Sequence, residues 1–177
     1  KRQVNETMMR IELPKPLKKG QTFSFYIKYH YNINDRLKLG GRSGYEYFEK
    51  EGNSIYTIAQ FFPRMAVYNE VEGWQNKQFL GNGEFTLPFG DYKVSITVPS
   101  DHVVAATGEL KNYNSVLSQK QIQRLNRAKK NYTNPEIIIT QGEAEANEKT
   151  KSISKKTWVF EAENVRDFAW ASSRKFI

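Results

Sequence analysis

The stretch FGDYKVSITVPSDHVVAATGEL, residues 89–110, decides the fold class of this chain. In its first half apolar and polar side chains alternate, and the run ends at Pro99. Four residues share the apolar face, namely Tyr92, Val94, Ile96 and Val98. A period of two is typical of a strand that buries one face and exposes the other. The second half predicts another strand that runs into a turn at Gly108, so the pair favours an antiparallel sheet.

The same period extends outward in both directions from this stretch. Two strands are expected between Gly81 and Asp101, and two more in residues 156–173, on either side of Glu163-Asn164. Further strands are predicted at residues 9–13 (MRIEL), 22–33 (TFSFYIKYHYNI), 54–62 (SIYTIAQFF) and 136–140 (EIIIT). The glycine-rich LGGRSGY, residues 39–45, is interpreted as a loop.

The period changes in SQKQIQRLNRAKK, residues 118–130, where Ile122, Leu125 and Ala128 are three apart. Ser118 followed by Gln121 resembles a capping box, so we expect one amphipathic helix here. Residues 141–152 (QGEAEANEKTKS) are polar and predict either a helical turn or a mobile loop. The fold expected is therefore mainly β, a two-sheet antiparallel β-sandwich with one inserted helix. Residues 1–177 form a single domain in this prediction, and 111–150 form a helical and polar insert.

Composition and charge narrow the function classes. The chain of 177 residues has no cysteine, which removes disulfides and thiolate metal sites. Its net charge is +8, but the basic residues are scattered along the chain, which indicates a solvated surface. We therefore expect no nucleic-acid partner. No apolar run approaches the ~20 residues of a membrane span, so no direct membrane insertion is expected. Because the sequence begins with Lys1, we expect a fragment whose signal peptide was removed or lies upstream.

Catalytic patterns are missing from the sequence. The two histidines, His30 and His102, are far apart, and His102 is expected on the surface of a turn. There is no His-Glu-x-x-His helix, no Gly-x-Ser-x-Gly elbow and no phosphate loop. We therefore predict no catalytic residue, no metal ligand and no cofactor within these 177 residues.

Three blocks nevertheless carry a family resemblance, and they occur in the same order as in that family. They are YTIAQFFPRMAVYNEVEGW (56–74), FTLPFGDYKVSITVPSDHVVAATGEL (85–110) and KTWVFEAENVRDFAWASSRKF (156–176). Together they resemble the N-terminal domain of bacterial zinc aminopeptidases of the aminopeptidase N family, the gluzincins. The resemblance covers about residues 8–177. It implies a saddle-shaped sandwich whose zinc lies in the catalytic domain that follows it in the same chain.

The resemblance also implies a role for the opening block. In the family this domain is one wall of the cleft and supplies a polar side chain that holds the free amino group of the peptide substrate. The candidates for substrate contact at this cleft rim are Gln60, Arg64, Asn69 and Glu70. Gln60 matches the first residue of the family's Gln-x-Glu or Gln-x-Gln motif, whereas Phe62 departs from the second. A missing carboxylate weakens ammonium binding, because charge-assisted hydrogen bonds are about twice as strong as neutral ones.

The resemblance thus predicts a parent protein that hydrolyses N-terminal residues from peptides, in the periplasm or outside the cell. Its zinc would be bound by the C-terminal catalytic domain and not by this chain. The alternative is a free-standing β-sandwich that binds carbohydrate or another ligand on exposed aromatic side chains. Coplanar, solvent-facing rings would favour that alternative, whereas a broad apolar surface would favour a domain that docks on another.

Overall fold

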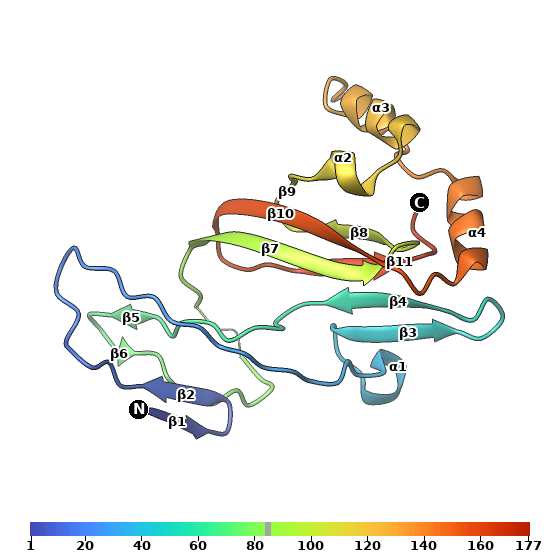
Figure 1. Ribbon diagram of the computed structural model, residues 1–177. Coiled ribbons are helices and arrows are strands. Elements are labelled where there is room, and N and C mark those ends of the chain that lie inside the picture. Colours follow the sequence, from blue (N-terminus) through green and yellow to red (C-terminus); the bar gives the residue numbers. More distant parts are fainter. Residues whose placement is uncertain (84–85) are drawn as a thin grey trace. The chain divides into compact units, whose positions relative to one another are not determined.

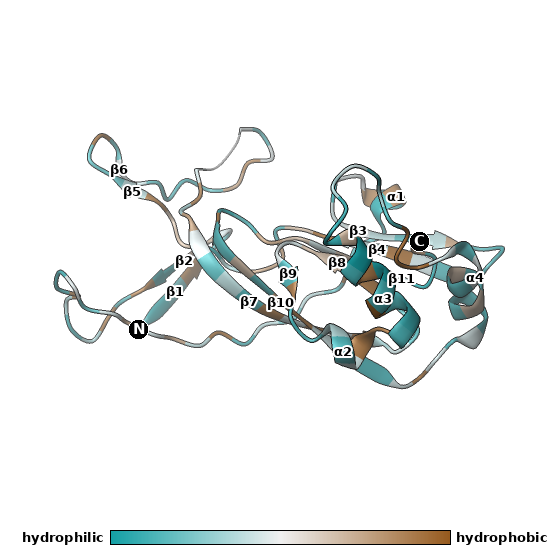
Figure 2. Cartoon of the chain, turned by 90° about the horizontal axis from the view of Figure 1, so that it is seen from above, coloured by the Kyte–Doolittle hydropathy of each residue, from teal (hydrophilic) through white to brown (hydrophobic). Residues whose placement is uncertain are grey.

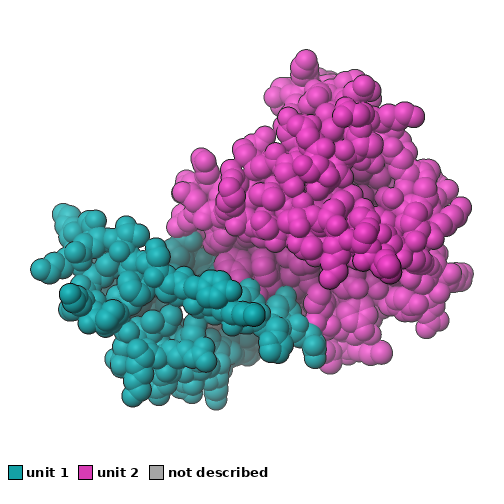
Figure 3. Space-filling model, in the orientation of Figure 1, with its two compact units in different colours: residues 1–32, 64–88 teal, residues 33–63, 89–177 magenta. Residues whose placement is uncertain are grey.

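The computed structural model describes residues 1–83 and 86–177 and is mainly β, with 31% of the chain in strands and 16% in helices (Figure 1). All strand pairs of the described sheets are antiparallel, so the predicted mainly β, antiparallel fold class is confirmed, whereas the described strands form four sheets and not the two that were predicted. The chain divides into two compact units (Figure 3). Unit 1 holds residues 1–32 and 64–88, and unit 2 holds residues 33–63 and 89–177.

Unit 2 contains two sheets. The first has the order β7 (Gly90–Pro99), β10 (Lys155–Val165), β9 (Glu109–Leu110). The second has the order β3 (Gly44–Phe48), β4 (Asn53–Ile58), β11 (Trp170–Ser173), β8 (Val103–Ala106). The stretch at residues 89–110 therefore starts in one sheet, crosses to the other through β8 and returns through β9.

The core of unit 2 takes side chains from both sheets. Its buried cluster consists of Ile96, Val98, Val104, Val116, Trp158, Phe160 and Phe168. Trp158 and Phe168 are the largest fully buried side chains. Ile96 and Val98 come from the apolar face predicted for β7, because alternation along the strand turns them inward. Burying side chains of this size contributes roughly 1.5–3 kcal/mol each to folding.

The segment between residues 111 and 150 carries three helices, where one was expected. They are α2 (Tyr113–Val116), α3 (Gln119–Ala128) and α4 (Gln141–Thr150). The capping box predicted for α3 is confirmed, since Ser118 and Gln121 bond to each other's backbone amides. Figure 2 shows α3 as largely hydrophilic, and Ile122 is its buried residue.

Unit 1 is built from two hairpins and extended chain. One hairpin pairs β1 (Arg2–Asn5) with β2 (Met8–Ile11), and the other pairs β5 (Tyr68–Asn69) with β6 (Gly73–Trp74). The side chain of Gln78 joins the first hairpin to the chain that follows β6. Its Oε1 accepts from the Thr7 amide at 2.9 Å, and its Nε2 donates to the Asn5 carbonyl at 2.9 Å.

Several predicted elements are correct. The four strands β2, β4, β7 and β8 overlap predicted strands, although β4 ends at Ile58 and residues 59–62 belong to no strand. Residues 156–173 contain two strands, β10 and β11. The break between β10 and β11 lies at residues 166–169, whereas Asn164 belongs to a bulge within β10. The second strand expected between Gly81 and Asp101 would include residues 84 and 85, which lie outside the described residues.

Other predictions are wrong. Residues 22–33 are not a strand, because none of their backbone amides or carbonyls has a hydrogen-bond partner in the part of the chain described. Residues 136–140 form no strand either, since Thr140 caps α4 and Arg124 holds the Ile138 carbonyl at 2.9 Å. The expected loop at residues 39–45 ends in β3, and a one-turn helix, α1 (Arg36–Leu39), precedes it.

Candidate functional site

Gln60, the leading candidate for substrate contact, lies just after the end of β4 in unit 2. Its backbone has a φ of 51°, in the left-handed region that few residues other than glycine adopt. The residues on both sides are fixed, because the Ala59 amide donates to Ser43 Oγ at 3.1 Å and the Phe61 ring packs 6.4 Å from the Trp170 ring. The side chain of Gln60 is consequently exposed between two anchored neighbours.

Phe62, two residues after Gln60, packs on aromatic side chains of unit 2. Its ring packs against Phe61 at 4.9 Å and Tyr92 at 5.7 Å, both edge to face. Tyr92 in turn lies 6.1 Å from the buried Phe168. A charged or amide side chain would lose these apolar contacts, so residue 62 belongs to the core.

The other three candidates belong to unit 1. Arg64 is half-buried. Asn69 ends β5, and its Oδ1 accepts from the amides of Val71 and Glu72 at 3.1 and 2.7 Å. Glu70 is exposed in the turn between β5 and β6. Asn69 and Glu70 therefore share one hairpin, in which Asn69 shapes the turn. That these residues meet Gln60 around one substrate remains a prediction.

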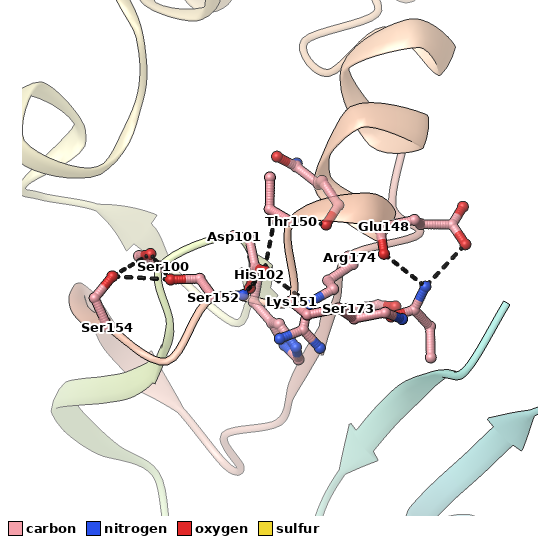
Figure 4. A network of polar contacts seen from close by, with 12 residues as sticks. Ser100, Asp101, His102, Glu148, Thr150, Lys151, Ser152, Ser154, Ser173 and Arg174 are labelled. Carbon is pink, nitrogen blue, oxygen red and sulfur yellow. Dashed lines mark hydrogen bonds and ion pairs between the residues drawn. The ribbon is translucent and has the colours of Figure 1, made fainter.

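A second group of polar residues, which sequence reasoning missed, lies entirely within unit 2 (Figure 4). Asp101, in the turn between β7 and β8, is 7% exposed, and its Oδ2 lies 2.8 Å from Nε of Arg174. The same oxygen accepts from the Thr150 hydroxyl at 2.8 Å and from the Ser152 amide at 2.6 Å. Burial alone would raise the pKa of Asp101, but these donors and the Arg174 charge hold it below its usual value.

His102 lies beside this carboxylate and is 3% exposed, so the expectation of a surface turn is wrong. Its Nδ1 lies 2.8 Å from the Ser172 hydroxyl, which is fully buried. Burial, together with the positive charge of Arg174, lowers the pKa of His102 to about 4. The imidazole is therefore neutral near pH 7.

A cluster of charged groups joins the end of α4 to the turn between β3 and β4. Lys151, with a φ of 47°, donates from Nζ to the carbonyls of Glu51 and Gly52, both at 2.8 Å. Glu148 Oε2 accepts from Lys175 at 2.9 Å and from Asn53 at 3.1 Å. Asn53 is 1% exposed, so these bonds satisfy a polar side chain that burial would otherwise penalise.

The role that these polar groups can have is structural. Ser172 and His102 resemble a nucleophile with its base, but both are closed to solvent, so no substrate reaches them. Among the described residues, no group of three or more His, Asp or Glu side chains could hold a metal ion. Arg174, Lys175 and α4 are tied to the same end of the two sheets. No local pattern in the sequence signals this arrangement, because its members come from four separate segments.

Comparison of the chain with protein-family models, with curated proteins and with solved structures gave no match. Across the residues that the structure describes, none of the helices has the length and apolar character needed to cross a bilayer.

Proposed function

We propose that this chain is the non-catalytic N-terminal β domain of a zinc-dependent aminopeptidase of the aminopeptidase N family. In this proposal it forms one wall of the substrate cleft and presents Gln60, with Arg64, Asn69 and Glu70 as further rim residues. The zinc and the reacting water belong to a catalytic domain of the same polypeptide, where a glutamate is the base. The location that follows from the resemblance is extracytoplasmic.

The observation that carries the proposal is that the three resembling blocks meet at Trp170. In β11, Trp170 pairs with Ile58 of the first block on one side and with Ala106 of the second block on the other. The Thr107 and Ala169 backbones are joined as well, through an amide-to-carbonyl bond of 3.0 Å and the Thr107 hydroxyl. The proposal requires the three blocks to belong to one domain, and this contact meets that requirement.

Gly108, in the turn of the second resembling block, supports the same view. Gly108 has a φ of +88°, and a Cβ there would lie 2.3 Å from the Glu161 carbonyl. Only glycine allows the chain to return from β8 to β9 at this point. The resemblance at this turn thus reflects a backbone requirement of the fold.

The distribution of apolar side chains fits a domain that docks on another. Every buried hydrophobic residue of the described chain belongs to unit 2, whereas fourteen of the twenty-two exposed large hydrophobics belong to unit 1. Large exposed apolar patches mark protein interfaces, and the apolar side chains of unit 1 are the candidates for such a patch. A catalytic domain that packs on unit 1 would remove this surface from water.

The carbohydrate-binding alternative is supported by one observation. Phe23 and Phe25 are partly exposed, with ring centroids 6.1 Å apart and planes 27° apart. The exposed pair Tyr68 and Trp74 is instead packed edge to face at 68°, which is no flat platform for a sugar ring. Binding of oligosaccharides that is lost in Phe23→Ala and Phe25→Ala would favour this alternative.

The proposal is tested with the isolated chain and with the longer gene product. The gene should encode a His-Glu-x-x-His helix downstream of Ile177, and the longer product should release aminoacyl fluorophores in a reaction that chelators stop. The isolated chain should release none with or without zinc. Zinc-dependent cleavage by the isolated chain, or a downstream sequence without that helix, would overturn the assignment.

A further inference from the structure

Residues 22–33 form an unpaired extended segment whose backbone and side chains are both open to a partner. The residues of this segment that belong to unit 1 run from Thr22 to Asn32. The aromatic residues alternate as in a strand, and the Phe23 and Phe25 rings lie on the same side, 6.1 Å apart. Yet no backbone amide or carbonyl from Thr22 to Asn32 has a hydrogen bond within the described residues. A segment whose backbone amides and carbonyls are free can pair with a strand of another chain.

The charge of this region indicates the kind of strand that it accepts. From Leu13 to Asn34 the sequence contains no acidic residue. It contains four lysines, namely Lys15, Lys18, Lys19 and Lys28. All four lysines are exposed, and none has an ion pair within the described residues. A docked strand with carboxylates at alternate positions would pair with these charges.

A second copy of this chain is a poor occupant by the same argument. Antiparallel pairing of two copies of residues 22–32 would bring two lysine-bearing segments together without a single carboxylate between them. Like charges opposite one another in a ladder are destabilising, and the chain as a whole carries +8.

We propose that residues 22–32 form a strand-addition site for an extended acidic peptide segment of another polypeptide. The acceptor supplies a ladder of backbone amides and carbonyls, which gives affinity. The exposed Lys28 and the neighbouring lysines select carboxylates, and the alternating Phe23, Phe25, Tyr29 and Tyr31 contact apolar side chains of the docked strand. The site includes none of the proposed cleft-rim residues, although three of them belong to the same unit. Because the catalytic domain of the proposed function would compete for this surface, the site is tested in the isolated chain.

The test uses the chain itself and peptides of about ten residues, the length of a long strand. The first peptide alternates glutamate with valine, the second has lysine in place of glutamate, and the third is the first with N-methyl groups on alternate amides. Binding is followed by fluorescence anisotropy, and hydrogen exchange shows which amides become protected. We expect the first peptide to bind and to protect amides in residues 22–32, and the other two to bind at least about tenfold more weakly.

Two substitutions distinguish binding at residues 22–32 from general attraction between the basic chain and an acidic peptide. Lys28→Glu should weaken binding of the glutamate peptide about fivefold, the upper limit for one exposed ion pair. Lys50→Glu, an exposed lysine in the turn between β3 and β4, changes net charge equally and should leave binding unchanged. Equal binding of the N-methylated peptide would overturn the proposal. Equal losses of peptide affinity in Lys28→Glu and Lys50→Glu would also overturn it. The same holds for amide protection outside residues 22–32, or for amide protection that rises with the concentration of the chain when no peptide is present.

Discussion

At the scale of the single residue, His102 makes stability depend on pH. Its folded pKa of about 4 lies below its ordinary value of 6.5, so between these values the unfolded chain binds a proton that the folded chain does not. The contribution of His102 to the free energy of unfolding is therefore fully present above pH 6.5. It is lost as the pH falls from 6.5 toward about 4, by about 1.4 kcal/mol per pH unit. Urea unfolding at several pH values should show this slope in the wild type and a smaller slope in His102→Gln. The control His30→Gln should have the same slope as the wild type. An unaltered slope in His102→Gln would contradict the assignment.

Asp101 is expected to be the most sensitive carboxylate of unit 2. Asp101→Asn removes the charge that faces the largely buried Arg174 and should cost about 3 kcal/mol, because one partner of a buried pair is left uncompensated. The pKa of Asp101 is lowered on folding, so its contribution is present above the carboxyl's ordinary pKa and is lost as the pH falls through the folded value. The loss in Asp101→Asn, measured by urea unfolding at pH 7, should therefore shrink toward acid pH.

The control is Asp91→Asn. Asp91 is exposed, and its Oδ1 accepts a single bond from the Asn164 amide at 2.8 Å, which an asparagine oxygen can also accept. Its effect should stay within about 0.5 kcal/mol. A similar loss in both variants would mean that the charge of Asp101 has no special role.

Gln60 is the residue on which the proposed function makes its most direct prediction. In the longer protein, Gln60→Ala should raise KM for aminoacyl substrates about tenfold with little change in kcat, because a hydrogen bond to the substrate ammonium is lost. Gln123→Ala, on the exposed face of α3, is the control. Equal KM values for Gln60→Ala and the wild type would remove Gln60 from the cleft rim and leave the fold unaffected.

At the scale of the element, the turn between β8 and β9 depends on one glycine. Gly108→Ala should destabilise by more than about 2 kcal/mol, since the new methyl group meets the Glu161 carbonyl and the φ of +88° disfavours alanine. Gly142→Ala in α4 has no atom within 4 Å of the new Cβ and should stabilise by about 0.5–1 kcal/mol. Thermal unfolding of both variants measures these two effects. A Gly108→Ala variant as stable as the wild type would contradict the close approach of residue 108 to the Glu161 carbonyl.

Elements were predictable where local chemistry decides them. Alternation placed β7 and β8 correctly because each strand has one buried face, and the Ser118 cap fixed the start of α3. Thr140 followed by Glu143 is the equivalent signal for the start of α4. Residues 22–33 have the same alternation as β7 yet no ladder, because a period of two reports the faces of a segment and not whether a neighbour pairs with it.

The candidate sites show the same limit. A motif points to Gln60, but no local pattern reports its left-handed backbone, its exposure or the packing of the neighbouring Phe61 on Trp170. Asp101 and Arg174 lie in unrelated segments and meet only after β7, β8 and β11 have assembled. Pairing of distant charges is a property of topology, and a single sequence does not contain it.

At the scale of the whole molecule, the two units should differ in resistance to opening. All buried hydrophobics of the described chain lie in unit 2, whereas unit 1 holds most of the exposed ones. Because opening free energy follows local burial, unit 1 should exchange its amide hydrogens and be cut by proteases well before β7 and β10. Limited proteolysis with mass spectrometry should find the first cuts in residues 1–32 and 64–88.

The same experiment on the longer gene product provides the control for a docking role. If another domain covers unit 1, the early cuts should be slowed at least tenfold there, while cuts in unit 2 should change little. Equal rates in the isolated chain and the longer product would mean that the exposed apolar side chains of unit 1 have no intramolecular partner. Early cuts in β7 or β10 would mean that burial does not set local stability in this chain.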